Sequence, residues 1–426
     1  MISMKKLYHQ NKLAFLSNLP DERPFNNRGK NSRLHSCLAE ADLDQLRCDY
    51  ESWEIEGSSA ELNYLSHGFF RFFGKFPPPV AKRFILEFHD PEGGPVVDPM
   101  VGSGTTLVEA ILLKRVAIGL DVNPLACLIS KVKTTPIPRE NVLKSLTAYN
   151  HFYKAELSEG LTPYIPNDRY LDHWFYPETQ QGIARTRFFI DKYIKDENTK
   201  NFFNVALAAI IRRLSRASNG MGRMFLDPAI PPQDVSEHLT KKAMQMSKVC
   251  NELLHLKPRV QVLLHDAREP FLSPAMTNLV ICHPPYFNLY RYSSIFKYEM
   301  LWLGYDYKDT RQNEVREGFK IGKKELVNLY VSDLEAILRN IARILVRGGW
   351  CVFMMGDTIL RGERINTTAF TIRRITESNM GLRLCKIIVR HPKFTEASYA
   401  ATQRRTKENV GVKLSDHLIV MQRVSS

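Results

Sequence analysis

The chain has 426 residues, 44% of them hydrophobic, so it is long enough for two or three domains around a sizeable core. Its apolar runs fall well short of the roughly 20 residues that span a bilayer, and residues 1–6 lead into a polar stretch rather than a signal-peptide core. We therefore expect a cytoplasmic protein with no membrane partner. Its oligomeric state is left open.

The net charge and the cysteines indicate what kind of partner and what kind of site to expect. Lys and Arg number 59 against 45 Asp and Glu, a net charge of +14. This excess points to a polyanionic partner such as a nucleic acid, or else it serves solubility alone. The seven cysteines are scattered, with no CxxC pair and no Cys/His spacing suited to zinc. We expect reduced thiols and no metal site.

The composition of the chain changes from polar to aromatic near residue 64. Residues 1–63 are polar and irregular, which predicts a loose arm or a small helical cap. An aromatic stretch from His67 to Phe76 follows, and the spacing of apolar residues predicts a helix over residues 80–88, with Pro79 in its first turn. The aromatic side chains fit either a core lid or an apolar wall for a ligand.

A glycine turn comes next. A short strand at residues 96–97 runs into Asp98-Pro-Met-Val-Gly-Ser-Gly-Thr-Thr106, and a helix is predicted over residues 107–113. Glycines let the backbone approach a ligand closely, and the start of the helix offers free N–H groups. The turn is not a Walker A loop, because no lysine follows Gly104, and it is not GxGxxG.

A second strand, at residues 116–120, ends at Asp121. An acid in this place can accept both hydroxyl groups of a ribose, or it can cap the helix that begins at Pro124. Strand, glycine turn, helix, strand and acid together favour the binding of a nucleoside.

Residues 131–258 interrupt the alternation of strands and helices. Helices are predicted at residues 202–216 and 235–256. The basic, glycine-containing loop at residues 215–223 suits the phosphate backbone of a nucleic acid, although its arginines also complement the end of a helix.

The alternation resumes with a strand at residues 259–264, followed by Asp266, which is either an acceptor for the amino group of an adenine or an ordinary loop aspartate. The strand at residues 279–282 then ends in His283-Pro284-Pro285-Tyr286, where two prolines without N–H groups stop it rigidly. The remaining predicted elements are a helix at 325–345, a strand at 350–355, a helix at 369–377 and strands at 384–389 and 417–421. Basic loops are expected at 316–324 and 391–407.

Together these segments resemble the amino-group DNA methyltransferases that use S-adenosylmethionine. Residues 98–106 are similar to their cofactor motif D-P-F-x-G-S-G-T-T, with Met100 in place of Phe, and residues 74–78 resemble the motif that packs on the methionine part. His283-Pro284-Pro285-Tyr286 occupies the place of their S/D/N-P-P-Y/F motif. The ending Ser415-Asp-His-Leu-Ile-Val resembles the last strand of the Ser-Pro-Pro-Tyr subgroup, mostly N4-cytosine enzymes.

The resemblance implies a fold, domains and a site. The fold is α/β, a doubly wound, mostly parallel, seven-stranded Rossmann-like methyltransferase sheet formed by residues 64–130 and 259–426, with 131–258 as a largely helical insert that recognises the target. The implied cofactor-binding residues are Lys75, Phe76, Pro77, Asp98, Pro99, Met100, Gly102, Ser103, Gly104, Thr105, Thr106, Asp121, Val122, Asn123, Asp266 and Ala267. The implied catalytic residues are His283, Pro284, Pro285 and Tyr286.

His283 departs from the family pattern. The family holds the target amine with two acceptors, the side chain at this position and a proline carbonyl. Neutral His283 has one acceptor nitrogen and protonated His283 has none, so an ordinary pKa of about 6.5 predicts loss of activity in acid. Tyr286 is expected to stack on a base swung out of duplex DNA. Otherwise His283 marks a diverged enzyme with weakened catalysis.

The expected function is methylation of an exocyclic amine of DNA, N4 of cytosine ahead of N6 of adenine, as in restriction-modification. Covalent C5 chemistry is disfavoured, because Cys282 points toward the core and Cys127 lies in an apolar helix. Two alternatives stay open: an RNA methyltransferase acting on a guanine amino group, and a non-catalytic nucleic-acid-binding protein of the same fold.

Overall fold

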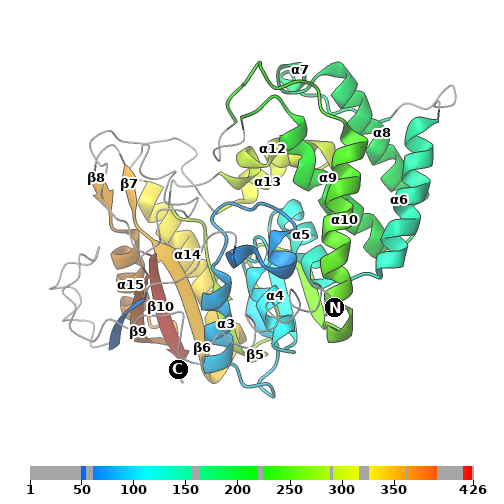
Figure 1. Cartoon of the computed structure of the whole chain (residues 1–426). Helices are drawn as coiled ribbons and strands as arrows, with labels where there is room; N and C mark the ends of the chain where they lie inside the picture. Colours follow the sequence, from blue (N-terminus) through cyan, green and yellow to red (C-terminus); the bar gives the residue numbers. More distant parts are fainter. Residues whose placement is uncertain are drawn as a thin grey trace.

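The computed structural model describes residues 49–53, 61–155, 163–218, 224–287, 291–315, 326–360, 363–390 and 416–424. Figure 1 shows a twisted sheet with helices on both faces beside a group of helices drawn mostly in green. None of the helices in these ranges is long and apolar enough to cross a membrane.

Within the described residues, eight strands form the main sheet, in the order β1-β9-β10-β6-β5-β2-β3-β4. They are β1 (Asp49–Trp53), β2 (Val96–Asp98), β3 (Ala117–Asp121), β4 (Val260–Leu264), β5 (Thr277–Cys282), β6 (Leu345–Gly356), β9 (Leu382–Arg390) and β10 (Asp416–Arg423). A separate hairpin joins β7 (Thr358–Leu360) and β8 (Glu363–Ile365). In the main sheet β10 runs antiparallel to both neighbours and the other pairings are parallel, which confirms the doubly wound, mostly parallel fold.

The prediction of a seven-stranded sheet was wrong by one strand, since the described part of the chain contributes eight. The extra strand, β1, comes from the segment expected to be an arm or cap, and it pairs in parallel with β9 at the edge of the sheet. Burial holds it there, because Trp53 is 1% exposed and stacks on Phe84 with ring centroids 5.4 Å apart.

Helices cover both faces of the sheet. Two apolar clusters fill the interfaces, one under α3 (Pro78–Phe88) and α4 (Thr105–Leu112), the other under α14 (Leu326–Ile344) and α15 (Thr367–Glu377). The central strand β5 is apolar and buried from Leu279 to Cys282, as expected of a strand covered on both sides.

Further helices of the described residues lie beside the sheet or connect to it. They are α5 (Pro124–Thr134), α6 (Arg139–Lys154), α7 (Leu171–Trp174), α8 (Pro177–Tyr193), α9 (Glu197–Leu214), α10 (Val235–Leu253), α11 (Tyr292–Ile295), α12 (Lys297–Trp302) and α13 (Tyr307–Asn313), with short 3-10 helices at Glu61–Asn63, Leu65–Gly68 and Leu254–Leu256. One hydrophobic core joins the helices of residues 131–258 to α5, to α12 and to Phe70 and Phe73. The largely helical character predicted for the insert is confirmed.

The order β5-β2-β3-β4 brings the ends of four parallel strands to one edge of the sheet. His283 follows β5, while Asp98 ends β2 and Asp121 ends β3. This carboxyl edge is where open α/β sheets bind ligands.

Candidate cofactor and active site

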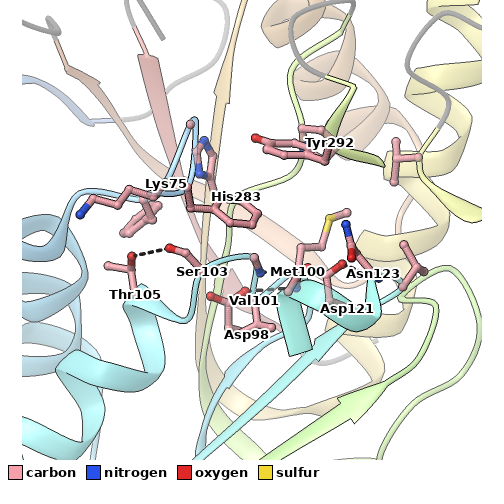
Figure 2. Close-up of a pocket in the computed structure, with 18 of the residues that line it drawn as sticks. Lys75, Asp98, Met100, Val101, Ser103, Thr105, Asp121, Asn123, His283 and Tyr292 are labelled. Carbon is pink, nitrogen blue, oxygen red and sulfur yellow. Dashed lines mark hydrogen bonds between the residues drawn. The ribbon is translucent and has the colours of Figure 1, made fainter. Parts of the chain in front are cut away.

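A cavity opens at this edge, and Figure 2 shows the side chains that surround it. It encloses about 720 Å³ of empty space, part of which is open to solvent. A second lobe of about 250 Å³ adjoins it, because Met100, Asp121, Val122 and Val315 line both.

Most of the residues predicted from the sequence meet here. The main lobe is lined by Lys75, Phe76, Asp98, Met100, Gly102, Ser103, Thr105, Asp121, Val122, Asn123, His283 and Pro285. The second lobe adds Pro99, Asp266 and Ala267. Pro77, Gly104, Thr106, Pro284 and Tyr286 are not among the lining residues. Pro77 instead occupies the N-cap of α3.

The glycine turn is pressed against α5. Gly102 and Gly104 have φ of +49° and +78°, conformations that favour glycine. A Cβ on Gly104 would lie 2.9 Å from Ser130 Oγ, and that hydroxyl donates to Gly102 O at 3.0 Å. Gly104 is therefore needed for packing, while Gly102 faces the cavity.

Asp121 joins two turns. Its Oδ2 accepts a hydrogen bond from Gly102 N and its Oδ1 from Asn123 N, each at 2.9 Å. Asn123 caps α5, because its Oδ1 accepts from Leu125 N at 2.9 Å. The alternative in which Asp121 caps this helix is therefore wrong.

Two features of the cavity wall around Asp121 and Asn123 fit a polar ligand. Asn123 is 3% exposed, and within the described residues its Nδ2 has no hydrogen-bond partner although the side chain lines the cavity. Burial raises the pKa of Asp98 to about 7 and that of Asp121 to about 6. Buried donors are normally satisfied, so these residues suit a ligand with an acceptor and with positive charge.

Asp266 lies in the second lobe, but its carboxylate is already engaged. Arg268 donates to it through Nε, at 3.0 Å to each oxygen, and through Nη2, at 2.6 Å to Oδ2. Arg268 also contacts Asp333 at 3.3 Å. Any ligand that donates to Asp266 must use the lone pairs that remain.

His283 lies between two aromatic rings. Phe76 and Tyr286 contact it edge-on, with centroids 5.6 Å and 5.3 Å away. Burial lowers the pKa of His283 to about 4; Asp416 opposes the shift and Arg390 adds to it. The expected protonation near pH 6.5 is thus wrong, because burial keeps the ring neutral to lower pH.

Two phenols hold the proline turn. Tyr330 Oη donates to Pro285 O, and Tyr286 Oη donates to Asp416 Oδ1, both at 2.8 Å. The turn is thereby tied to α14 on one side and to β10 on the other. Sequence reasoning gave no role to Tyr330 or Asp416.

The cavity also has residues that were missed. Phe72 and Tyr292 line it and stack on each other at 5.3 Å, and their aromatic segments were the only signal. Glu314 and Val315 line it from the end of α13, with no motif around them.

The other chemical expectations have mixed outcomes. Cys282 is fully buried, and neither Cys282 nor Cys127 is among the described residues that line the cavity. In the basic loop, the guanidinium carbon Cζ of Arg216 lies 4.9 Å from the centroid of the Tyr176 ring. Other predicted segments lie outside the described residues. They are the N-terminal arm at 1–48, part of the basic loop at 219–223, the basic loops at 316–324 and 391–407, and Ser415.

Comparisons with known proteins find similarity to DNA methyltransferases. Residues 35–132 match the model of the N6/N4 DNA methylase family. The chain is 24% identical to the type II methyltransferase M.MvaI of Kocuria varians over 69% of its length and 71% of that protein. It is 22% identical to M.AvaI of Nostoc over 74% and 72%. A match to M.MjaII of Methanocaldococcus jannaschii reaches 42% but covers 16% of this chain and 12% of that protein. The ordered motifs and these matches support a relationship of this chain to the amino-group DNA methyltransferase family.

Proposed function

We propose that this chain transfers a methyl group from S-adenosylmethionine to an exocyclic amine in DNA, N4 of cytosine ahead of N6 of adenine. One observation carries the proposal: the glycine turn, Asp121 and the His-Pro-Pro turn, far apart in sequence, line a single cavity.

The cofactor would be held by the residues around the glycine turn. Gly102 allows close backbone approach, the Asn123 amide offers an unfilled donor, and Asp121 keeps lone pairs for hydroxyl groups. Phe76 supplies an apolar wall. When bound, S-adenosylmethionine supplies an electrophilic methyl group.

The target amine needs help because its lone pair is delocalised into the ring of the base. Neutral His283 can accept one N–H of this amine, and a carbonyl of the proline turn can accept the other. Both acceptors lie on a turn that Tyr330 and Asp416 hold in place. Holding the amine in one orientation is where we expect most of the acceleration.

The nucleic acid would meet the same edge. A base inside a duplex cannot reach the cavity, so we expect it to be swung out beside Tyr286. The net charge of +14 and the helices of residues 131–258 would hold the phosphate backbone. The type II methyltransferase names of M.MvaI and M.AvaI favour DNA over RNA and a place in restriction-modification.

The test measures transfer of labelled methyl from S-adenosylmethionine to genomic duplex DNA and to tRNA, followed by mass spectrometry of the nucleosides. We expect N4-methylcytosine from DNA, with His283→Ala reducing the yield to background. Methylated guanosine from tRNA would instead support the RNA alternative. No transfer to either, with DNA binding intact in both proteins, would identify a non-catalytic binding protein.

A further inference from the structure

Glu314 is a half-buried acid in the cavity wall that the family motifs leave without a role. It forms the C-cap of α13, and its carboxylate accepts two hydrogen bonds from Ser293 of α11, at 2.7 Å from N and 3.0 Å from Oγ. These bonds hold the carboxylate in place. Glu314 itself lines the main lobe, while its neighbours Asn313 and Val315 line the second lobe. Glu314 therefore lies where the two lobes join.

The charges around Glu314 are unbalanced toward negative. Asp98 and Asp121 line the same lobe, and Asp121 is close enough to act on the titration of Glu314. Among the described lining residues the basic side chain is Lys75, whose ammonium donates to Asn63 Oδ1 at 2.6 Å. Arg311, one turn earlier, partly offsets Glu314.

The titration of Glu314 agrees with this arrangement. Burial raises its pKa to about 7, the Ser293 bonds oppose the rise, and Asp121 adds to it. A cation placed between these carboxylates would be attracted to both of them. The unfilled Asn123 amide in the same wall is an independent sign that a polar ligand belongs there.

We propose that Glu314 binds the methyl donor and selects it over its product by charge. The inference rests on the proposed function. S-adenosylmethionine carries an ammonium, a sulfonium and a carboxylate, a net charge of +1, whereas S-adenosylhomocysteine has lost the sulfonium charge and is neutral overall. The same carboxylate would thus favour entry of the donor and release of the product.

The test is isothermal titration of the wild type, Glu314→Gln and Asp309→Asn with three ligands. Sinefungin joins the donor and the product, because it carries an amine in place of the sulfonium and is also cationic. Glutamine keeps the size of Glu314 and can still bond Ser293. Asp309 is an exposed acid of α13, so Asp309→Asn removes the same charge outside the cavity.

In Glu314→Gln we expect binding of the donor and of sinefungin to weaken about tenfold, as for loss of one partly buried charge contact, and that of the product by less than about twofold. Asp309→Asn should bind all three as the wild type does. Equal weakening for all three ligands, or none, would overturn the inference. A wild type that binds none of them would instead overturn the proposed function.

Discussion

Tyr286 Oη and Asp416 Oδ1 lie 2.8 Å apart and join the proline turn to β10. The other oxygen of Asp416 accepts from Arg390 Nε at 2.9 Å, and these two residues are register partners in the sheet. Both are almost fully buried. The ring of Tyr286 is therefore held by a charged pair within the sheet.

Removing the phenol hydroxyl tests whether this anchor serves methylation. Tyr286→Phe keeps the ring and the Asp416–Arg390 pair but loses one hydrogen bond, worth about 1 kcal/mol. We expect the single-turnover rate on DNA to fall between about twofold and tenfold, with donor affinity unchanged in titration. Tyr193→Phe, at an exposed tyrosine, is the control. A rate equal to that of the wild type in both Tyr286→Phe and Tyr286→Ala would contradict a role for this side chain.

Gly356 limits the position of the same ring. A Cβ at this residue would lie 2.5 Å from Tyr286 Cε2, so Gly356→Ala must displace the ring. We expect destabilisation by about 1–3 kcal/mol, as for an overpacked core, and a rate at least as low as that of Tyr286→Phe. Thermal unfolding and single-turnover kinetics measure the two effects.

Gly348→Ala provides the comparison. Gly348 lies on the same strand with φ of +81°, and a Cβ there would meet no atom of the described residues within 4 Å. Alanine at this position therefore brings backbone strain without touching Tyr286. This variant should lose stability but keep its rate. A parallel loss of rate in both variants would show that the effect comes from β6 as a whole.

The local parts of the site were predictable from the sequence. The glycine turn and the proline turn each carry their geometry in a few consecutive residues, because glycine permits positive φ and proline ends a strand. Their meeting follows from one rule, that parallel strands place their carboxyl ends at the same edge.

What could not be predicted depends on distant contacts. Strand β1 forms because β9, near the other end of the chain, offers it an edge and a site for Trp53. Asp121 and Asn123 are equally good caps by residue type, and only the backbone of α5 decides between them. Glu314 has no motif, since its role arises from where α13 packs.

The dependence of methyl transfer on pH below 7 should separate binding of the donor from catalysis. The pKa of His283 is about 4, so the ring stays an acceptor, and the rate at saturating donor should hold down to about pH 5. Asp98 and Glu314 have pKa values of about 7 and Asp121 of about 6, and each loses its negative charge as the pH falls through its value. The KM for the donor should therefore rise between pH 7 and 6.

Across this pH range, single-turnover rates measure catalysis and titrations with the donor measure its binding. A rate that falls with a midpoint near pH 6.5, while donor affinity stays constant, would mean that His283 titrates as an exposed histidine does. Glu314→Gln is the matched variant here: it should lower donor affinity at pH 7 and flatten its dependence on pH, with the rate at saturation still unaffected down to about pH 5.

Lys133, a buried lysine of α5, should lower the free energy of unfolding. It is 1% exposed, and within the described residues its Nζ has no hydrogen-bond partner. Burial lowers its pKa well below the ordinary value, and Lys75 and Lys242 lower it further. The unfolded chain therefore binds a proton that the folded chain lacks, which disfavours folding until the pH approaches the ordinary pKa of about 10.4.

Lys133→Met keeps the length of the side chain and removes the amine. We expect the free energy of unfolding in urea to rise by about 1–3 kcal/mol at pH 7, and by less at pH 9.5, where the unfolded lysine is closer to neutral. Lys131→Met, at an exposed position of the same helix, should change it by less than about 0.5 kcal/mol. A loss of stability in Lys133→Met alone would show that the buried ammonium is charged and has a partner, because only then does its removal leave an opposite charge uncompensated.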